Sequence, residues 1–299
     1  MIIIAIKNGL GNQMFQYAFG KVLEWKYSFD VAFDIMPDDF VSCKKTDMEI
    51  FTIGEYIIVE KKQTLAFQPF SIAKYRHEKK YLSYIYYKLR RMFHPDKLVT
   101  EKLPCQMVAE FENLSPARQY YFMGHWMNLK YFSGFEDRIK ALFLLKDPVF
   151  YQSDMALEII NSTSAPVSLH IRRGDYLTSG FIQAAEMSYY EKAIHLIAEQ
   201  VHNPMLYIFT NDPEWVTKEF KPELPYKIVQ GNNGADSYKD LVLMSLCKHN
   251  ITANSSFSWW GAWLNNNPKP LIVCPKQWYA EETLNTYVSE MIPQHWVRL

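Results

Sequence analysis

Short apolar runs alternate with helical segments through the second half of the chain, and this alternation constrains the fold more than any other feature. The apolar runs have the length of strands and occupy residues 167–171, 205–210, 227–230, 251–254 and 271–274. The helical segments between them occupy residues 188–201, 213–220, 236–249 and 257–266. Strands that alternate with helices form a parallel sheet with right-handed crossovers. We therefore predict an α/β domain here.

The first half begins with the same type of unit. Residues 2–6 form an apolar strand candidate, residues 8–12 a glycine-containing turn, and residues 13–27 a helix. Further strands are expected at residues 29–35 and 120–124, and a helix at residues 128–145. A Ser/Thr/Asn cluster at residues 161–164 follows, and we place the domain join near it. The predicted domains are residues 1–155 and residues 156–299.

Composition narrows the class of protein. Lys plus Arg and Asp plus Glu both number 32, so the formal net charge is zero and nucleic-acid binding is not indicated. The four cysteines form no Cys-x-x-Cys pair, which is typical of reduced thiols in a cytosolic protein without a zinc site. No apolar run approaches the ~20 residues that span a bilayer. We therefore expect a cytoplasmic protein.

Polar clusters follow three of the predicted strands. They are His170 with Arg172 and Arg173, Thr210 with Asn211 and Asp212, and Asn254 with Ser255 and Ser256. In a parallel sheet the carboxyl ends of the strands lie at one edge, where α/β proteins bind ligands. The three clusters are therefore expected to build one polar cleft.

The adjacent arginines indicate a ligand that carries a diphosphate, because guanidinium stays charged and suits phosphate. Neighbouring side chains on an extended segment point to opposite faces. We assign Arg172 to the phosphate and Arg173 to support of the loop. His170 is interpreted as either a core residue or a ligand contact. Asp175 is either a partner of an arginine or a catalytic base.

Three further features each have two interpretations. Residues 254–258 resemble a helix N-cap, and the same N-terminus can hold phosphate oxygens. Asp240 either complements a helix dipole or accepts two donors from a guanine edge. The loop from Gly9 to Gln13 is either an ordinary turn or an anion site. It is not a dinucleotide fingerprint, because Met14 stands where a third glycine is required.

Residues 74–97 mix lysine and arginine with tyrosine and phenylalanine. Such a segment can lie on an anionic membrane surface, although a solvated helical face explains the pattern more simply. The chain contains no Asp-x-Asp pair of the kind that holds a divalent metal beside a sugar diphosphate. We therefore expect protein cations, not a metal ion, to neutralise the leaving diphosphate.

Together these motifs resemble the α-1,2-fucosyltransferases of glycosyltransferase family 11. Residues 9–18, GLGNQMFQYA, are similar to the family's N-terminal signature, and residues 170–176, HIRRGDY, to the arginine motif that several classes of fucosyltransferase share. Residues 254–264 are similar to its C-terminal motif. Residues 38–112 carry none of the resemblance. Many relatives have glycine where this chain has Asn8, and we expect a stiffer loop.

The resemblance implies a GT-B fold, with two Rossmann-like domains facing a cleft. The first domain would lie on the acceptor side and the second would bind the GDP-sugar. It implies inverting, metal-independent transfer of L-fucose from GDP-L-fucose to the 2-OH of a terminal galactose. No cofactor is expected. The implied partners are GDP-L-fucose and a galactose-terminated glycan acceptor.

The resemblance also implies a role for particular residues. Arg172 would hold the β-phosphate, and His170 and Asp240 would contact the guanine or ribose. Asn12 and the backbone around Gly11 would reach the pyrophosphate or fucose. The full set of expected donor-binding residues is Gly11, Asn12, His170, Arg172, Arg173, Asp240, Asn254, Ser255, Ser256 and Phe257. Arg172 and Asp175 are the expected catalytic residues, and Glu186 is a weaker candidate base.

Two alternatives remain open: another fucosyl linkage, such as α-1,6, or a non-catalytic protein that binds GDP or a glycan. A bacterial enzyme of surface polysaccharide synthesis would meet a lipid-linked acceptor at the inner membrane. Residues 74–97 are compatible with peripheral contact there.

Overall fold

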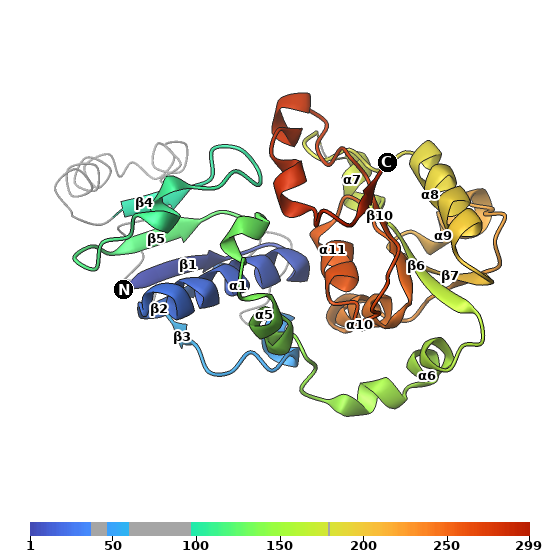
Figure 1. The fold of residues 1–299 in the computed structure, drawn as a ribbon, viewed down its shortest axis with the longest axis horizontal. Helices are drawn as coiled ribbons and strands as arrows, with labels where there is room; N and C mark the ends of the chain where they lie inside the picture. The colour runs from blue at the N-terminus through green and yellow to red at the C-terminus, as the bar shows by residue number, and fades with distance from the viewer. Residues whose placement is uncertain (37–46, 60–96, 179) are drawn as a thin grey trace, which may run out of the picture. The chain divides into compact units, whose positions relative to one another are not determined.

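The computed structural model describes residues 1–36, 47–59, 97–178 and 180–299, and their packing divides the chain into two compact units (Figure 1). The first unit comprises Met1–Gly9, Gln13–Glu49 and Ile53–Leu142. The second comprises Leu10–Asn12, Ile50–Thr52 and Phe143–Leu299. The predicted functional boundary between residues 155 and 156 stays a prediction.

The first unit contains a five-stranded parallel sheet in the order β3-β2-β1-β5-β4. Its strands are β1 (Ile2–Ile6), β2 (Val31–Ile35), β3 (Ile57–Ile58), β4 (Lys97–Thr100) and β5 (Tyr120–Met123). Strand β1 lies at the centre and all five of its residues are buried, as expected for a short apolar run between two neighbours. The chain proceeds from β1 toward β3 on one side, whereas β5 lies on the other side of β1.

Helix α1 (Leu10–Tyr27) begins earlier than the predicted start at residue 13. Gly9 is its N-cap in an extended conformation, and Asn8 before it has a positive φ of 66°.

The expected helix over residues 128–145 is wrong in extent, because a 3-10 turn at Leu129–Tyr131 precedes a short α5 (Glu136–Leu142). Gly134, with a φ of 82°, lies between the two pieces and interrupts the helical backbone.

The second unit contains a six-stranded parallel sheet in the order β11-β10-β9-β6-β7-β8. The strands are β6 (Ala165–Ile171), β7 (Pro204–Thr210), β8 (Tyr226–Ile228), β9 (His249–Ile251), β10 (Ile272–Cys274) and β11 (Val297–Arg298). Strand β6 is buried along its whole length. The predicted parallel α/β sheet is confirmed, although β9 ends at Ile251 and not at residue 254.

Helices cover both faces of this sheet. The helices of this unit are α6 (Asp154–Ile160), α7 (Gly174–Thr178), α8 (Met187–Gln200), α9 (Pro213–Glu219), α10 (Tyr238–Leu246) and α11 (Ser256–Trp263). The alternation of side chains along β7 shows the two layers. Leu206 and Ile208 pack in one core with α8 and α9, whereas Tyr207 and Phe209 pack in another with α6 and α10. The sequence did not predict α6 or the short α7.

Candidate functional site

Strand order places a switch point between β6 and β9 in the second unit. From β6 the chain runs to β7 and β8 on one side, and then returns to β9 on the other side of β6. The loops that follow β6 and β9 therefore diverge at the carboxyl edge of the sheet, where open α/β sheets bind ligands. The loop after β6 begins with Arg172, and the loop after β9 contains Asn254 and Ser255.

His170 lies near the end of β6 and is buried, with 5% of its surface exposed. Its ring lies 5.9 Å from the ring of Phe257, the second residue of α11, measured between centroids. Burial, and then the nearby charge of Arg172, lowers the pKa of His170 to about 3. The Nδ1 atom has no hydrogen-bond partner among the residues that the structure describes. His170 is therefore a neutral imidazole with a buried polar atom that no described residue satisfies.

The two arginines after β6 have different surroundings. Arg173 Nε donates to Asp212 Oδ2 at 3.3 Å, and its guanidinium lies 3.7 Å from the centre of the Trp215 ring. The guanidinium of Arg172 instead lies 5.5 Å from the centre of the Tyr176 ring. Asp212 lies just beyond β7 and also caps α9 by accepting from Trp215 N at 3.2 Å. Arg173 thus ties the loop after β6 to the loop after β7.

Helix α11 begins in the loop after β9, and its N-terminus contacts the first turn of α1, which packs as part of this unit. A Cβ built on Gly11 would lie 2.6 Å from Phe257 N and 2.8 Å from Ser256 Oγ. Trp260 Nε1 donates to Gly11 O at 2.9 Å. Only glycine permits this approach, so Gly11 shapes the helix N-terminus whatever it contacts in a ligand. The neighbouring Asn12 is half-buried.

Asn254 holds the loop after β9 in place. Its Nδ2 donates to Gln183 O at 2.6 Å and to Trp278 O at 2.9 Å. The side chain is buried, with 2% exposed, and its Oδ1 has no hydrogen-bond partner in the described part of the chain. These contacts give Asn254 a structural task beside the donor-binding role predicted for it. Ser255 is the N-cap of α11 and is also buried.

A cavity of about 570 Å³ lies at the carboxyl ends of β7 and β8, on the other side of β6 from β9. Residues from β7, α9, the loop after β8 and α10 line it: Thr210, Pro213, Glu214, Thr217, Val229, Gln230, Gly231, Asn232, Asn233 and Asp240. Its size is that of a typical ligand pocket. Of the residues that the sequence assigned to the donor, Asp240 lines this cavity.

Asp240 is positioned by the first turn of α10 and by the loop after β8. Asn232 Nδ2 donates to its Oδ1 at 2.6 Å. Burial raises the pKa of Asp240 to about 6, although the bond from Asn232 opposes the rise. A carboxylate kept in a cavity at this energetic cost is a candidate ligand contact. Sequence inspection missed Asn232, because the Gly-Asn-Asn-Gly stretch at residues 231–234 resembles an ordinary turn.

Of the two candidate bases, Asp175 and Glu186, the structure describes the side chain of Glu186 but not that of Asp175. The backbone of Asp175 lies in α7, but its side chain lies outside the described part of the structure, and its role stays a prediction. Glu186 is exposed at the start of α8 and lines a different pocket from Asp240. Of the basic segment at residues 74–97, only Lys97 is among the described residues.

The first unit has its own switch point, between β1 and β5. Asn8 Nδ2 lies 3.0 Å from His125 Nε2, and Glu101 accepts from the backbone N of His125 at 2.6 Å. Burial lowers the pKa of His125 to about 4 and raises that of Glu101 to about 7. Asn8 adopts the left-handed backbone, which asparagine tolerates better than most residues and glycine accepts freely. This explains physically how asparagine can replace glycine at this position.

Two features are absent from the part of the chain that the structure describes: a cluster of metal-binding side chains and a membrane-spanning helix. No three His, Cys, Asp or Glu residues in it gather closely enough to hold a metal ion. Every helix described in it is too short or too polar to cross a membrane.

Comparison with known families decides the class of protein. The model of glycosyl transferase family 11 matches residues 1–299. The chain belongs to glycosyltransferase family 11. The resemblance predicted from the sequence motifs is therefore confirmed, and it extends over the segment that carried no motif.

Two curated relatives align with nearly the whole chain, and a third aligns with about half of it. The O-antigen biosynthesis glycosyltransferase WbnK of Escherichia coli is 30% identical over 307 residues, which cover 98% of this chain and 99% of that protein. An alpha-1,2-colitosyltransferase of Escherichia coli is 27% identical over 313 residues, covering 100% and 99%. The galactoside 2-alpha-L-fucosyltransferase of Caenorhabditis elegans is 30% identical over 153 residues, covering 48% and 42%.

Solved structures show the fold. The fucosyltransferase NodZ from Bradyrhizobium matches with a TM-score of 0.51 and 13% identity, over 87% of this chain and 91% of that one. FUT1 of Arabidopsis thaliana, in complex with GDP, matches with a TM-score of 0.51 and 12% identity, over 98% and 75%. The predicted GT-B type of α/β fold is confirmed.

Proposed function

We propose that this member of glycosyltransferase family 11 transfers L-fucose from GDP-L-fucose to the 2-OH of a terminal galactose. The proposal includes inversion at the anomeric carbon and independence of a metal ion. The observation that carries it is a match to the family over the whole chain, combined with a cavity that presents Asp240 at the carboxyl edge of the second sheet. The Caenorhabditis elegans relative supports the galactoside acceptor and the α-1,2 linkage.

The cavity at the ends of β7 and β8 suits the guanosine end of the donor. The carboxylate of Asp240 can accept two parallel N–H donors, which guanine offers on its Watson–Crick edge. Asn232 already uses Oδ1 of that carboxylate as its acceptor and fixes its orientation. The neutral His170, near the end of β6, is the second contact that we assign to the nucleoside.

The diphosphate then belongs beside the loops that follow β6 and β9. When the bond from fucose C1 to the β-phosphate oxygen breaks, negative charge develops on GDP. Arg172 and the N-terminus of α11 supply a cation and backbone N–H groups where that charge grows, and such stabilisation lowers the barrier. The acceptor O2 attacks C1 from the opposite face and loses its proton to a base, for which Asp175 is our candidate.

A second donor has specific support. The alpha-1,2-colitosyltransferase relative aligns with the whole chain, whereas the Caenorhabditis elegans fucosyltransferase aligns with about half of it. Colitose is L-fucose without the 3-hydroxyl, so one site can accept both sugars unless it forms a hydrogen bond with that hydroxyl. A site built around such a bond rejects the deoxy sugar strongly, because its polar group is left unpaired.

The deciding experiment compares GDP-fucose with GDP-colitose on a panel of galactosides and maps each product linkage by NMR. Fucose in α-1,2 linkage supports the proposal, whereas an α-1,6 product or transfer of colitose alone replaces it. Arg172→Ala serves as the control for contaminating activity, since it should abolish transfer. GDP binding without any product would favour a non-catalytic binding protein.

The natural acceptor in this proposal is a glycan of a bacterial surface polysaccharide, carried on a lipid at the cytoplasmic face of the inner membrane. The role of WbnK in O-antigen biosynthesis supports this acceptor class. Sedimentation with vesicles of anionic lipid tests the membrane contact: binding that disappears at high salt supports a peripheral electrostatic contact. Equal sedimentation with and without vesicles would exclude one under those conditions.

A further inference from the structure

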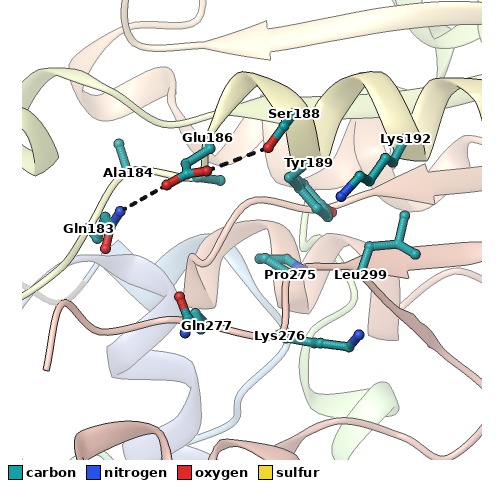
Figure 2. Close-up of a pocket in the computed structure, with 11 residues that line it drawn as sticks. Gln183, Ala184, Glu186, Ser188, Tyr189, Lys192, Pro275, Lys276, Gln277 and Leu299 are labelled. Carbon is teal, nitrogen blue, oxygen red and sulfur yellow. Dashed lines mark hydrogen bonds between the residues drawn. The ribbon is translucent and has the colours of Figure 1, made fainter. Parts of the chain in front are cut away.

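A second pocket lies in the second unit, on the opposite side of the switch point from the Asp240 cavity. Its volume is about 290 Å³. One wall comes from seven residues between Gln183 and Lys192, the second comes from residues 275–277, and Leu299 completes the lining (Figure 2). The second wall directly follows β10, which lies beyond β9 in the sheet order. Along one sheet edge the order is therefore this pocket, the loops after β9 and β6, and the Asp240 cavity.

The pocket is tied to the loop after β9. Asn254 Nδ2 donates to the carbonyl of Gln183 in one wall and to the carbonyl of Trp278, just beyond the other wall. The same two segments are also joined by a β-bridge between Ile182 and Tyr279 and by a backbone hydrogen bond of 3.1 Å from Ala280 N to Phe181 O. The pocket walls and the N-terminus of α11 are thus held in one geometry.

The side chains in the pocket suit a ligand rich in hydroxyl groups. Gln183 Nε2 donates to Glu186 Oε1 at 3.4 Å, and Ser188 Oγ lies 3.5 Å from Glu186 Oε2 (Figure 2). Lys276 and Gln277 are exposed on the facing wall. Carboxylate, amide and ammonium groups together offer both donors and acceptors. Lys192 also lines the pocket, which therefore presents one side-chain carboxylate and two ammonium groups. Sugar hydroxyls can use all of these groups as donors or acceptors.

An aromatic side chain adjoins the polar pocket. Phe181 is 50% exposed, and its ring packs edge-on against Tyr279, with 5.1 Å between centroids. The β-bridge between Ile182 and Tyr279 places Phe181 and Tyr279 beside the segment that enters the pocket wall at Gln183. Phe181 does not line the pocket itself, but a half-exposed aromatic side chain two residues before the pocket wall can pack against the apolar face of a pyranose, whose polar edges then reach the polar lining.

We propose that this pocket is a subsite for a sugar residue of the acceptor glycan that lies beyond the terminal disaccharide, whose galactose receives fucose. The inference rests on the proposed function and adds where the acceptor extends. The nucleotide is assigned to the ends of β7 and β8, and the leaving group to the loops after β6 and β9. Of the two pockets described above, the one beside β10 is the one to which no part of the donor is assigned.

The test compares a galactose-terminated disaccharide with a tetrasaccharide that has the same terminal galactose. For the wild type we expect kcat/KM to be higher with the tetrasaccharide by roughly three- to tenfold for each hydrogen bond gained. The double variant Lys276→Ala, Gln277→Ala should lose this advantage and keep its kcat/KM for the disaccharide and its affinity for GDP. The matched control Lys269→Ala, Gln200→Ala removes the same groups from exposed positions outside the pocket and should behave as the wild type.

Two results would overturn the subsite: no preference of the wild type for the longer acceptor, or a preference that the double variant retains. Binding of the tetrasaccharide in the presence of GDP, followed by saturation-transfer NMR, separates this failure from that of the proposed function. If no galactoside is fucosylated but the wild type binds the glycan and the double variant does not, the pocket stands and the reaction is wrong. If disaccharides are fucosylated but kcat/KM does not depend on the length of the acceptor, the proposed reaction stands and the pocket is not a subsite.

Discussion

Replacing Asp240 by asparagine should stabilise the ligand-free protein and weaken its binding of GDP. Burial raises the pKa of this carboxyl from 3.8 to about 6. A shift of this size corresponds to about 3 kcal/mol by which the ionised carboxylate destabilises the folded state. Asparagine resembles the protonated acid in shape and carries no charge. At pH 8 we therefore expect Asp240→Asn to unfold at a higher urea concentration, with a gain of up to about 3 kcal/mol.

The stability of the wild type depends on pH through the proton that Asp240 binds, and the sign follows from which state binds it more tightly. Because the pKa of Asp240 is higher in the folded chain, the folded state holds the proton between pH 3.8 and about 6 and loses stability as the pH rises through this range. The amount by which the unfolding free energy of Asp240→Asn exceeds that of the wild type should be full above about pH 7. It should fall to about half near pH 5 and nearly vanish near pH 4. Comparing variant with wild type at each pH cancels other titrating groups, among them Glu101.

The same substitution should weaken GDP binding, since a hydrogen bond to a charged acceptor contributes about 1.5–3 kcal/mol, or roughly ten- to hundredfold in Kd. Wild-type affinity should likewise fall below about pH 6, where Asp240 takes up a proton. Asp236→Asn is the matched control, because this exposed aspartate pairs with Lys239 at 2.8 Å and does not line the cavity. Calorimetric titration with GDP measures the effect. Loss of stability in Asp240→Asn at pH 8, or unchanged GDP affinity, would refute the reasoning.

Three other predictions concern the packing of Gly11, the need for a metal ion and the role of Asp175. Gly11→Ala should cost about 1–3 kcal/mol of unfolding free energy and weaken GDP binding, because its methyl group would meet the Phe257 backbone. Gly9→Ala, where nothing lies within 4 Å, should change urea unfolding by less than about 0.5 kcal/mol, and equal effects of the two would argue against the packing role. EDTA should leave the initial rate of transfer unchanged, and inhibition that added Mg²⁺ or Mn²⁺ reverses would show a metal-dependent reaction. Asp175→Asn should lower kcat by about 10²–10⁴-fold if Asp175 is the base, whereas a loss of only a few fold would assign it a structural role.

The sheet core could be predicted from the sequence because its strands are short apolar runs. Strand β1 matches its predicted bounds, and β6 and β7 differ from theirs only at the amino end. The start of α1 could not be predicted in the same way. Glycine disfavours a helix by about 1 kcal/mol, so Gly11 resembled part of a turn. The structure places it within the helix, where the contact with Phe257 requires a residue without a side chain.

The site was only partly visible in the sequence for a related reason. Residues after parallel strands meet at one edge by topology alone, so the cluster around His170 could be proposed without a structure. The bond from Asn232 to Asp240 joins a loop to a helix and depends on how β8 ends. The task of Asn254 likewise depends on two carbonyl groups, of Gln183 and Trp278, whose positions no local pattern encodes. Such contacts follow from tertiary packing.

The tandem arginines show how one short motif can serve both binding and architecture. Asp212 uses one carboxylate oxygen to cap α9 and the other to accept from Arg173, so the cap and the ion pair fix each other. Lysine at position 173 would keep the charge but lose both the close cation–π contact of the guanidinium with Trp215 and the directed bond from Nε. The loop after β6 would then be less firmly oriented. Arg173 therefore sets the backbone from which Arg172, the arginine that we propose contacts the diphosphate, extends.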